Sequence, residues 1–105
     1  MRLRLHPEAS LEGVEARIWI GEDDARQGMI FADALVATLQ KIKKNPLIYR
    51  CFDGEFRQIQ VAKFSYSVIF RITDCEIQVV AIMHQHRRPG YWKDRDESWR
   101  RGARE

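Results

Sequence analysis

The chain has 105 residues, 45% hydrophobic and 31% charged, which is typical of one globular domain with a modest core. No apolar run approaches the ~20 residues of a membrane span, and no basic segment followed by an apolar one opens the chain, so we expect a cytoplasmic protein with no membrane association. Cys51 and Cys75 fit no metal-binding or redox spacing and do not suggest a disulfide scaffold.

The net charge of +3 is unevenly distributed along the chain. Residues 1–33 carry four bases and seven acids, a net charge of −3, whereas residues 34–72 carry seven bases and two acids, a net charge of +5. The last third has seven bases and six acids, with bases leading in its first part. The resulting basic surface would attract anionic partners, either acidic proteins or phosphate backbones.

A strand and two helices are predicted in the first half of the chain. Residues 2–6 alternate between polar and apolar side chains, as in a half-buried strand. Pro7 suits the first turn of a helix, which GEDD at 21–24 ends. We expect the apolar stripe of this helix to face the core; it consists of Leu11, Val14 and Ile18, widened by Trp19 and Ile20.

A second helix is predicted from Ala25 to Lys44, where Asn45-Pro46 stops it. Three lysines occupy its last turn, where cations are favoured. Its expected core stripe is Phe31, Leu35, Leu39 and Ile42. The two helices should form a hairpin.

Three strands are predicted in the second half, at 55–61, 66–72 and 76–84, separated by turn signals. Strict alternation in the last strand would place Val80 and Ile82 on the same face as His84. The short connections indicate an antiparallel three-stranded meander. The order β-α-α-β-β-β predicts an α+β fold, a helical hairpin packed on one face of the sheet. We expect a single domain over residues 1–95 and a charged tail over 96–105, frayed or a short exposed helix.

The segment HQHRRPGYW, residues 84–92, contains most of the candidate functional groups, and we refer to it as the exit turn. Histidines beside arginines could act as general acid and base on a phosphate, as in a ribonuclease. Arginines and aromatic residues are also the groups that dominate protein interfaces. Alternatively, Trp92 folds back and caps the sheet. No acid or cysteine lies nearby to complete a metal site, and no cofactor motif is present, so neither is expected.

Several short motifs follow one another in order along the chain: LHPEA (5–9), FADAL (31–35), KNP (44–46), FRQIQVAKFSYSVIFRI (56–72) and VVAIMHQHRRPGYW (79–92). Through these motifs the chain resembles, over residues 2 to about 95, the ParE branch of the RelE/ParE toxin superfamily, toxins of bacterial type II toxin–antitoxin (plasmid stabilisation) modules. The family's element order is also β-α-α-β-β-β.

The resemblance implies a toxin that a small antitoxin neutralises. ParE-like members are associated with inhibition of DNA gyrase, whereas RelE-like members cut mRNA in the ribosome. The RelE-like pattern has an arginine after the tyrosine that corresponds to Tyr66, but Ser67 stands here. This difference favours a non-enzymatic gyrase inhibitor that does not itself bind DNA. Its expected target-binding residues are His84, His86, Arg87, Arg88, Tyr91 and Trp92.

Two alternatives remain. One is a ribosome-dependent mRNA endonuclease that acts through Arg57, Lys63, His86, Arg87 and Tyr91. The other is an inactive relic that only binds antitoxin. In each case the antitoxin is expected to bind grooves of the sheet and hairpin as an amphipathic helix plus an added strand. Candidate contacts are Trp19, Ile20 and Met29, although Trp19 is equally a candidate for the core.

Overall fold

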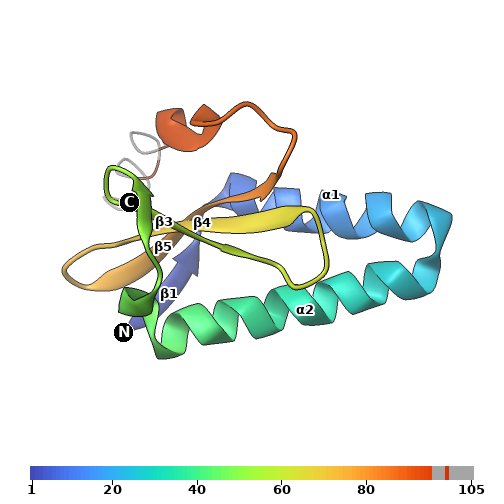
Figure 1. Ribbon diagram of the computed structural model, residues 1–105, viewed down its shortest axis with the longest axis horizontal. Helices are drawn as coiled ribbons and strands as arrows, with labels where there is room; N and C mark the ends of the chain where they lie inside the picture. The colour runs from blue at the N-terminus through green and yellow to red at the C-terminus, as the bar shows by residue number, and fades with distance from the viewer. Residues whose placement is uncertain (96–98, 100–105) are drawn as a thin grey trace.

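In the computed structural model, which describes residues 1–95 and 99, a helical hairpin lies along one face of a twisted sheet (Figure 1). The elements in chain order are β1 (Arg2–Leu5), α1 (Pro7–Asp23), α2 (Ala25–Lys44), the 3₁₀ turn η1 (Pro46–Ile48), β2 (Cys51–Asp53), β3 (Phe56–Gln60), β4 (Tyr66–Ile72), β5 (Glu76–His84) and the 3₁₀ turn η2 (Tyr91–Asp94). The predicted α+β fold and element order are confirmed. None of the described helices is long and apolar enough to cross a membrane.

The sheet is larger than the predicted meander. β3, β4 and β5 form that antiparallel meander, but the full strand order is β1-β5-β4-β3-β2. β1 lies parallel to β5, with Leu3 opposite Ile77, and the unpredicted β2 pairs with β3. The sheet is therefore mixed rather than purely antiparallel. Periodicity within a segment could not show this, because the β1–β5 pairing joins strands more than 70 residues apart.

Side chains cap both helices at their first turns. Nδ1 of His6 accepts a hydrogen bond from the N–H of Glu8 at 3.0 Å, and Asp24 accepts one from the N–H of Arg26 at 2.9 Å. α2 has the predicted bounds. α1 continues two residues past Gly21, because Gly21 is not a helix end but the point where α1 and α2 cross. A Cβ on Gly28 of α2 would lie 2.9 Å from the carbonyl oxygen of Arg17.

The predicted core face of α1 is wrong. Leu11, Val14 and Ile18 are 55%, 49% and 53% exposed, and the buried residues are the small ones, Ala9, Gly13 and Ala16. The reason is close packing: a Cβ on Gly13 would lie 3.1 Å from Ile82 Cδ1 on β5 and 3.3 Å from Leu35 Cδ2 on α2. Only small side chains fit in this space, so the large apolar side chains point outward.

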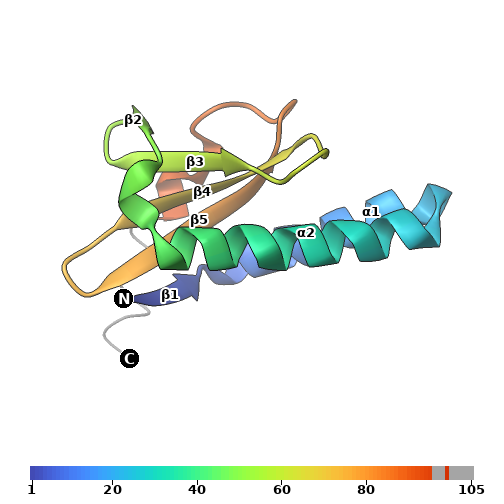
Figure 2. The ribbon, with the colours of Figure 1, turned by 60° about the horizontal axis from the view of Figure 1, so that its bottom comes forward.

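Core residues lie on both faces of the sheet. On the hairpin side, Phe31 and Ile42 of α2 pack with Val68, Phe70, Ile77 and Val79. The second core contains Ile69, Val80 and Ala81, together with Trp92 of η2 and Trp99. Two views show α1 and α2 on one side of the sheet and the chain of η2 on the other (Figures 1 and 2). Trp99 is 5% exposed, contrary to the expected exposed tail; the rest of that tail lies outside the described residues.

A bulge in β5 breaks the predicted alternation. Ile69 pairs with Ala81 but Phe70 pairs with Val79, so Val80 is an extra residue. Both Val80 and Ala81 consequently join the second core, while Ile82 contacts Gly13 on the hairpin side. His84 shares the face of Ile82, as predicted, but not that of Val80. The bulge thus directs His84 toward α1.

The crossing of the two helices predicts opposite effects of alanine at its two glycines. Ala in place of Gly28 would press against backbone atoms, whereas a Cβ on Gly21 would meet only Gly28 Cα at an ordinary 3.7 Å. We expect Gly28→Ala to lower the free energy of unfolding by about 1–3 kcal/mol. Gly21→Ala should be neutral or stabilising by up to ~1 kcal/mol, because Ala favours helix. Thermal unfolding of both variants tests this, and equal midpoints would contradict it.

The His6 cap predicts a loss of stability in mild acid. Burial lowers the pKa of His6 below its ordinary value of 6.5, and the charge of Arg95 lowers it further against the opposing effects of Glu8 and Glu12. As the pH is lowered through about 6.5, His6 therefore binds a proton more readily in the unfolded chain than in the folded one. The free energy of unfolding consequently decreases as the pH is lowered. Asn at position 6 can cap the helix but not titrate.

We expect His6→Asn to lose less stability than the wild type between about pH 7.5 and 5.5 in urea unfolding. Identical losses in the two proteins would rule out His6 as the source.

Candidate functional site

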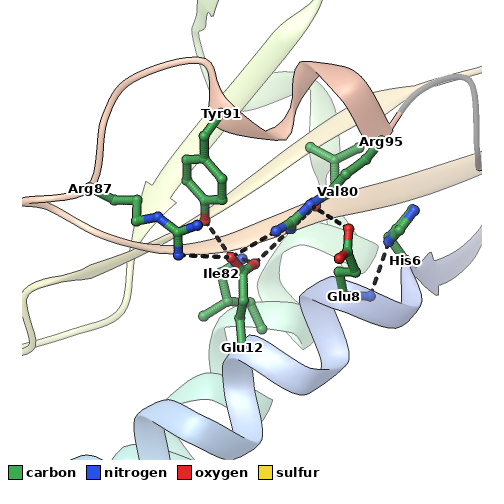
Figure 3. A network of polar contacts seen from close by, with 8 residues as sticks. All are labelled: His6, Glu8, Glu12, Val80, Ile82, Arg87, Tyr91 and Arg95. Atoms are coloured by element: carbon green, nitrogen blue, oxygen red, sulfur yellow. Dashed lines mark hydrogen bonds and ion pairs between the residues drawn. The ribbon is translucent and has the colours of Figure 1, made fainter.

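The carboxylate of Glu12 on α1 joins three parts of the chain (Figure 3). Its Oε1 accepts hydrogen bonds from Arg95 Nη1 at 2.8 Å and from the N–H of Ile82 at 3.0 Å. Its Oε2 accepts from the Tyr91 hydroxyl at 2.6 Å and from Arg95 Nη2 at 3.0 Å. The guanidinium of Arg95 is thus held in a bidentate pair, the strongest geometry for these groups. Glu12 is nearly saturated with donors.

These contacts complete the open edge of β5. The β1–β5 pairing ends at Leu5 and Val79, and beyond it the edge of β5 would lack partners. Arg95 donates to the Val80 carbonyl at 2.9 Å and Glu12 accepts from the Ile82 N–H. The ion pair therefore supplies the hydrogen bonds that a longer β1 would have made. It also ties η2 and the second core to α1.

The surroundings of Tyr91 and Arg95 raise the pKa values of both side chains. Burial, followed by the hydrogen bond to Glu12, raises the pKa of Tyr91 well above its usual range. Burial alone would lower the pKa of Arg95, but its bonds to Glu12 raise it above the ordinary value. Glu8 adds a further ion pair, 3.2 Å from Arg95 Nε. At neutral pH Tyr91 is a fixed hydrogen-bond donor rather than an acid or base.

The exit turn places four of its predicted residues near this cluster. Arg87 lies over the Tyr91 ring, 4.1 Å from its centroid, with Nη1 4.0 Å from Glu12 Oε2. The rings of His84 and His86 lie 5.1 Å apart, and the His86 N–H donates to His84 Nδ1 at 3.1 Å. A groove of about 280 Å³ separates His84 and Arg87 from α1. His86 and Arg87 are exposed, as expected.

The two remaining predicted target-binding residues differ in exposure. Arg88 is exposed and lines a second groove with Glu8 and Asp94. Trp92 is only 1% exposed and packs against the rings of Phe52 and Phe56. The alternative that Trp92 folds back and caps the sheet is therefore confirmed, because its large apolar ring closes the second core.

Of the five residues of the ribonuclease hypothesis, Arg57 lies apart from the exit turn. His86, Arg87 and Tyr91 are close, but Arg57 donates to the carbonyl of Tyr49 at 2.7 Å and supports the chain before β2. Arg57 pairs with Phe70, four residues along β4 from Tyr66, which pairs with His84. That separation corresponds to about 13 Å along the strand. Lys63, with a positive φ of 69°, lies in the β3–β4 turn. No group of three or more potential metal ligands occurs among the described residues.

Sequence reasoning missed Glu12 and Arg95, which organise the cluster. The only available signal was that Glu12 shares a helical face with Ala9 and Ala16, three and four positions away. That signal identifies Glu12 as inward-facing only if the small residues, rather than the large ones, form the buried face of α1.

Comparison with known proteins agrees with this fold. The family model of the ParE toxin of the type II toxin–antitoxin system parDE matches residues 3–89. No curated protein sequence matches the chain. Among solved structures, "Chromosomal ParDE TA system from P. aeruginosa" superposes with a TM-score of 0.72 at 14% sequence identity, covering 80% of this chain and 95% of that one. At this identity the likeness shows the fold.

The family match runs from β1 into the exit turn and so includes every element that positions the Glu12 cluster except η2 and Arg95. Since it covers well over half of the sequence, the chain belongs to the ParE toxin family of type II toxin–antitoxin systems.

Proposed function

We propose that this toxin inhibits DNA gyrase by binding it through the exit turn, and that it does not cleave RNA. The observation that carries this proposal is the hydrogen bond from the Tyr91 hydroxyl to the Glu12 carboxylate, which lies beside Arg87. A ribonuclease would need these two groups free to act on a phosphate and the attacking hydroxyl. Here the Tyr91 hydroxyl donates to a carboxylate, and Arg87 lies against the same carboxylate.

A negatively charged Glu12 would also repel a phosphate approaching these groups. Two further features weaken the ribonuclease hypothesis. Arg57 lies away from the exit turn and donates to the backbone carbonyl of Tyr49, and Ser67 stands where the RelE-like pattern has arginine. The same features suit docking, because the Glu12 cluster holds the exit turn in one conformation. A pre-ordered turn loses little conformational entropy when it binds.

The exposed groups of the proposed docking surface are cationic or aromatic. His86, Arg87 and Arg88 are exposed, and His84 and Tyr91 are half-buried beside them. Arg88 is the best probe, because its side chain makes no ion pair or hydrogen bond with any residue that the structure describes. Its charge can therefore be reversed with little effect on the fold.

The test compares Arg88→Glu with Lys41→Glu, a control that reverses an exposed charge in the last turn of α2. Purified wild-type protein should inhibit gyrase supercoiling. Arg88→Glu should raise the half-inhibitory concentration about tenfold or more, since a reversed charge at an interface repels its partner. Lys41→Glu should stay within about twofold.

Three results would contradict this proposal: no inhibition of gyrase by the wild type, equal effects of the two substitutions, or cleaved mRNA after induction of the toxin in cells. Normal growth on induction without antitoxin would instead support the inactive relic.

For the antitoxin, we propose that its amphipathic helix lies on the outer face of the α1–α2 hairpin. Leu11, Val14 and Ile18 form an exposed stripe there, and an apolar stripe of this kind marks an interaction site. Val14 and Val36 line one groove of about 270 Å³ between the helices, and Ile18 and Met29 line the next, of about 340 Å³.

Of the three contacts expected from the sequence, Trp19 and Met29 are exposed. Ile20 is half-buried against the core, so it is not part of this surface. β1 and β2, the edge strands among the described residues, are the places where a strand could be added.

The antitoxin surface predicts a selective effect of charge on α1. We expect Val14→Asp to weaken binding of the antitoxin at least tenfold, because a carboxylate would be buried in an apolar contact. Leu47→Asp, at an exposed apolar residue of η1 outside this surface, should bind as the wild type does. Isothermal titration calorimetry measures both, with thermal unfolding of each free toxin as a check on folding. A loss of affinity in Leu47→Asp, or none in Val14→Asp, would place the interface elsewhere.

A further inference from the structure

The groove between α1 and the end of β5 has an unusual pair of residues on its α1 wall. Glu15 and Trp19 lie one helical turn apart, so their side chains are neighbours on the same face. Trp19 is 67% exposed, the most exposed large apolar side chain of α1. Across the groove, the rings of Tyr66 and His84 lie 4.9 Å apart in an edge-on arrangement. The groove is thus lined mainly by aromatic rings and carboxylates, with Arg87, which pairs with Glu12, on the wall opposite α1.

Glu15 differs from the other acids of this region in having no partner. Glu12 is saturated by Arg95, Tyr91 and Ile82, and Glu8 pairs with Arg95. Over residues 1–95 and 99, by contrast, the exposed carboxylate of Glu15 makes no ion pair or hydrogen bond. Of these three carboxylates, only that of Glu15 has no guanidinium partner among the described residues.

An exposed indole beside an unpaired carboxylate is suited to a cation. Indole is the best aromatic partner of an ammonium or guanidinium group, and a carboxylate adds a charge-assisted hydrogen bond. The molecule uses the same combination internally, because Arg87 lies over the Tyr91 ring next to the Glu12 carboxylate. Glu15 and Trp19 present a second ring and carboxylate without an internal cation.

We propose that this groove receives an arginine or lysine side chain of the antitoxin, so that Glu15 and Trp19 set the specificity of the toxin for its antitoxin. This inference rests on the antitoxin-binding surface proposed above. Leu11 and Ile18 lie on α1, on a face next to that of Glu15. An antitoxin helix that covers the apolar stripe therefore passes beside Glu15. Apolar contacts then supply affinity, and the cation fixes register and partner choice.

The test is calorimetric titration of full-length toxin variants with the antitoxin encoded beside the toxin gene. Glu15→Gln keeps the shape of the side chain and removes its charge. Asp33→Asn, the control, removes an exposed charge of α2 that lines none of the grooves described. We expect Glu15→Gln to weaken binding about tenfold and Asp33→Asn to change it less than about twofold. The difference should shrink between about 50 and 500 mM salt.

Charge exchange provides the second arm. Glu15→Lys should bind still more weakly, and one Arg→Glu or Lys→Glu substitution in the antitoxin should restore its affinity. Equal binding by the wild type and Glu15→Gln, or a Glu15→Lys defect that no single substitution in the antitoxin rescues, overturns the inference and leaves the apolar interface standing. Failure of the wild-type toxin to bind the antitoxin overturns both.

Discussion

The rest of the structure depends on the ion pair between Glu12 and Arg95. β1 has four residues and β5 has nine, so the outer edge of β5 extends beyond its partner strand. There Glu12 accepts a hydrogen bond from the Ile82 N–H and Arg95 donates one to the Val80 carbonyl. These contacts hold the chain of η2 against α1. Burying two charges is costly even when they are paired, and removing one partner of such a pair typically destabilises by about 3–5 kcal/mol. The second core, which Trp92 closes, therefore depends on a polar contact rather than on apolar packing alone.

The same carboxylate connects stability to function. Glu12 accepts a hydrogen bond from the Tyr91 hydroxyl, which is therefore engaged, and its carboxylate lies 4.0 Å from the guanidinium of Arg87. The exposed cations of the exit turn stay available at the surface. A ribonuclease and a docking protein could share every residue type of the exit turn. Under the proposed function, the residue that separates them is a single acid on α1, more than 70 positions away in the sequence.

Patterns within single segments of the sequence predicted the elements that depend on contacts between nearby residues. Helix α2, the β3–β4–β5 meander and the element order follow from apolar periodicity, helix-ending residues and turn signals. The inward face of α1 could not be predicted, because hydrophobicity favoured Leu11, Val14 and Ile18, while the space between β5 and α2 admits only small side chains such as Gly13. The bulge at Val80 shifts the side chains that follow it by one position, and no residue type in β5 predicts a bulge there. The Glu12 cluster and the β1–β5 pairing depend on distant contacts. A pattern within one segment contains no information on these.

The orientation of α1 has a consequence for the complex. A helix that packs through Ala9, Gly13 and Ala16 approaches its neighbours closely but gains little from the burial of apolar area. Its large apolar side chains are left at the surface, where they would strengthen a complex with a partner that covers them. A partner that covers them binds only the folded toxin, and it therefore raises the stability of the fold by mass action. Under the proposed function, the large apolar side chains of α1 stabilise the complex with the antitoxin instead of the core of the toxin.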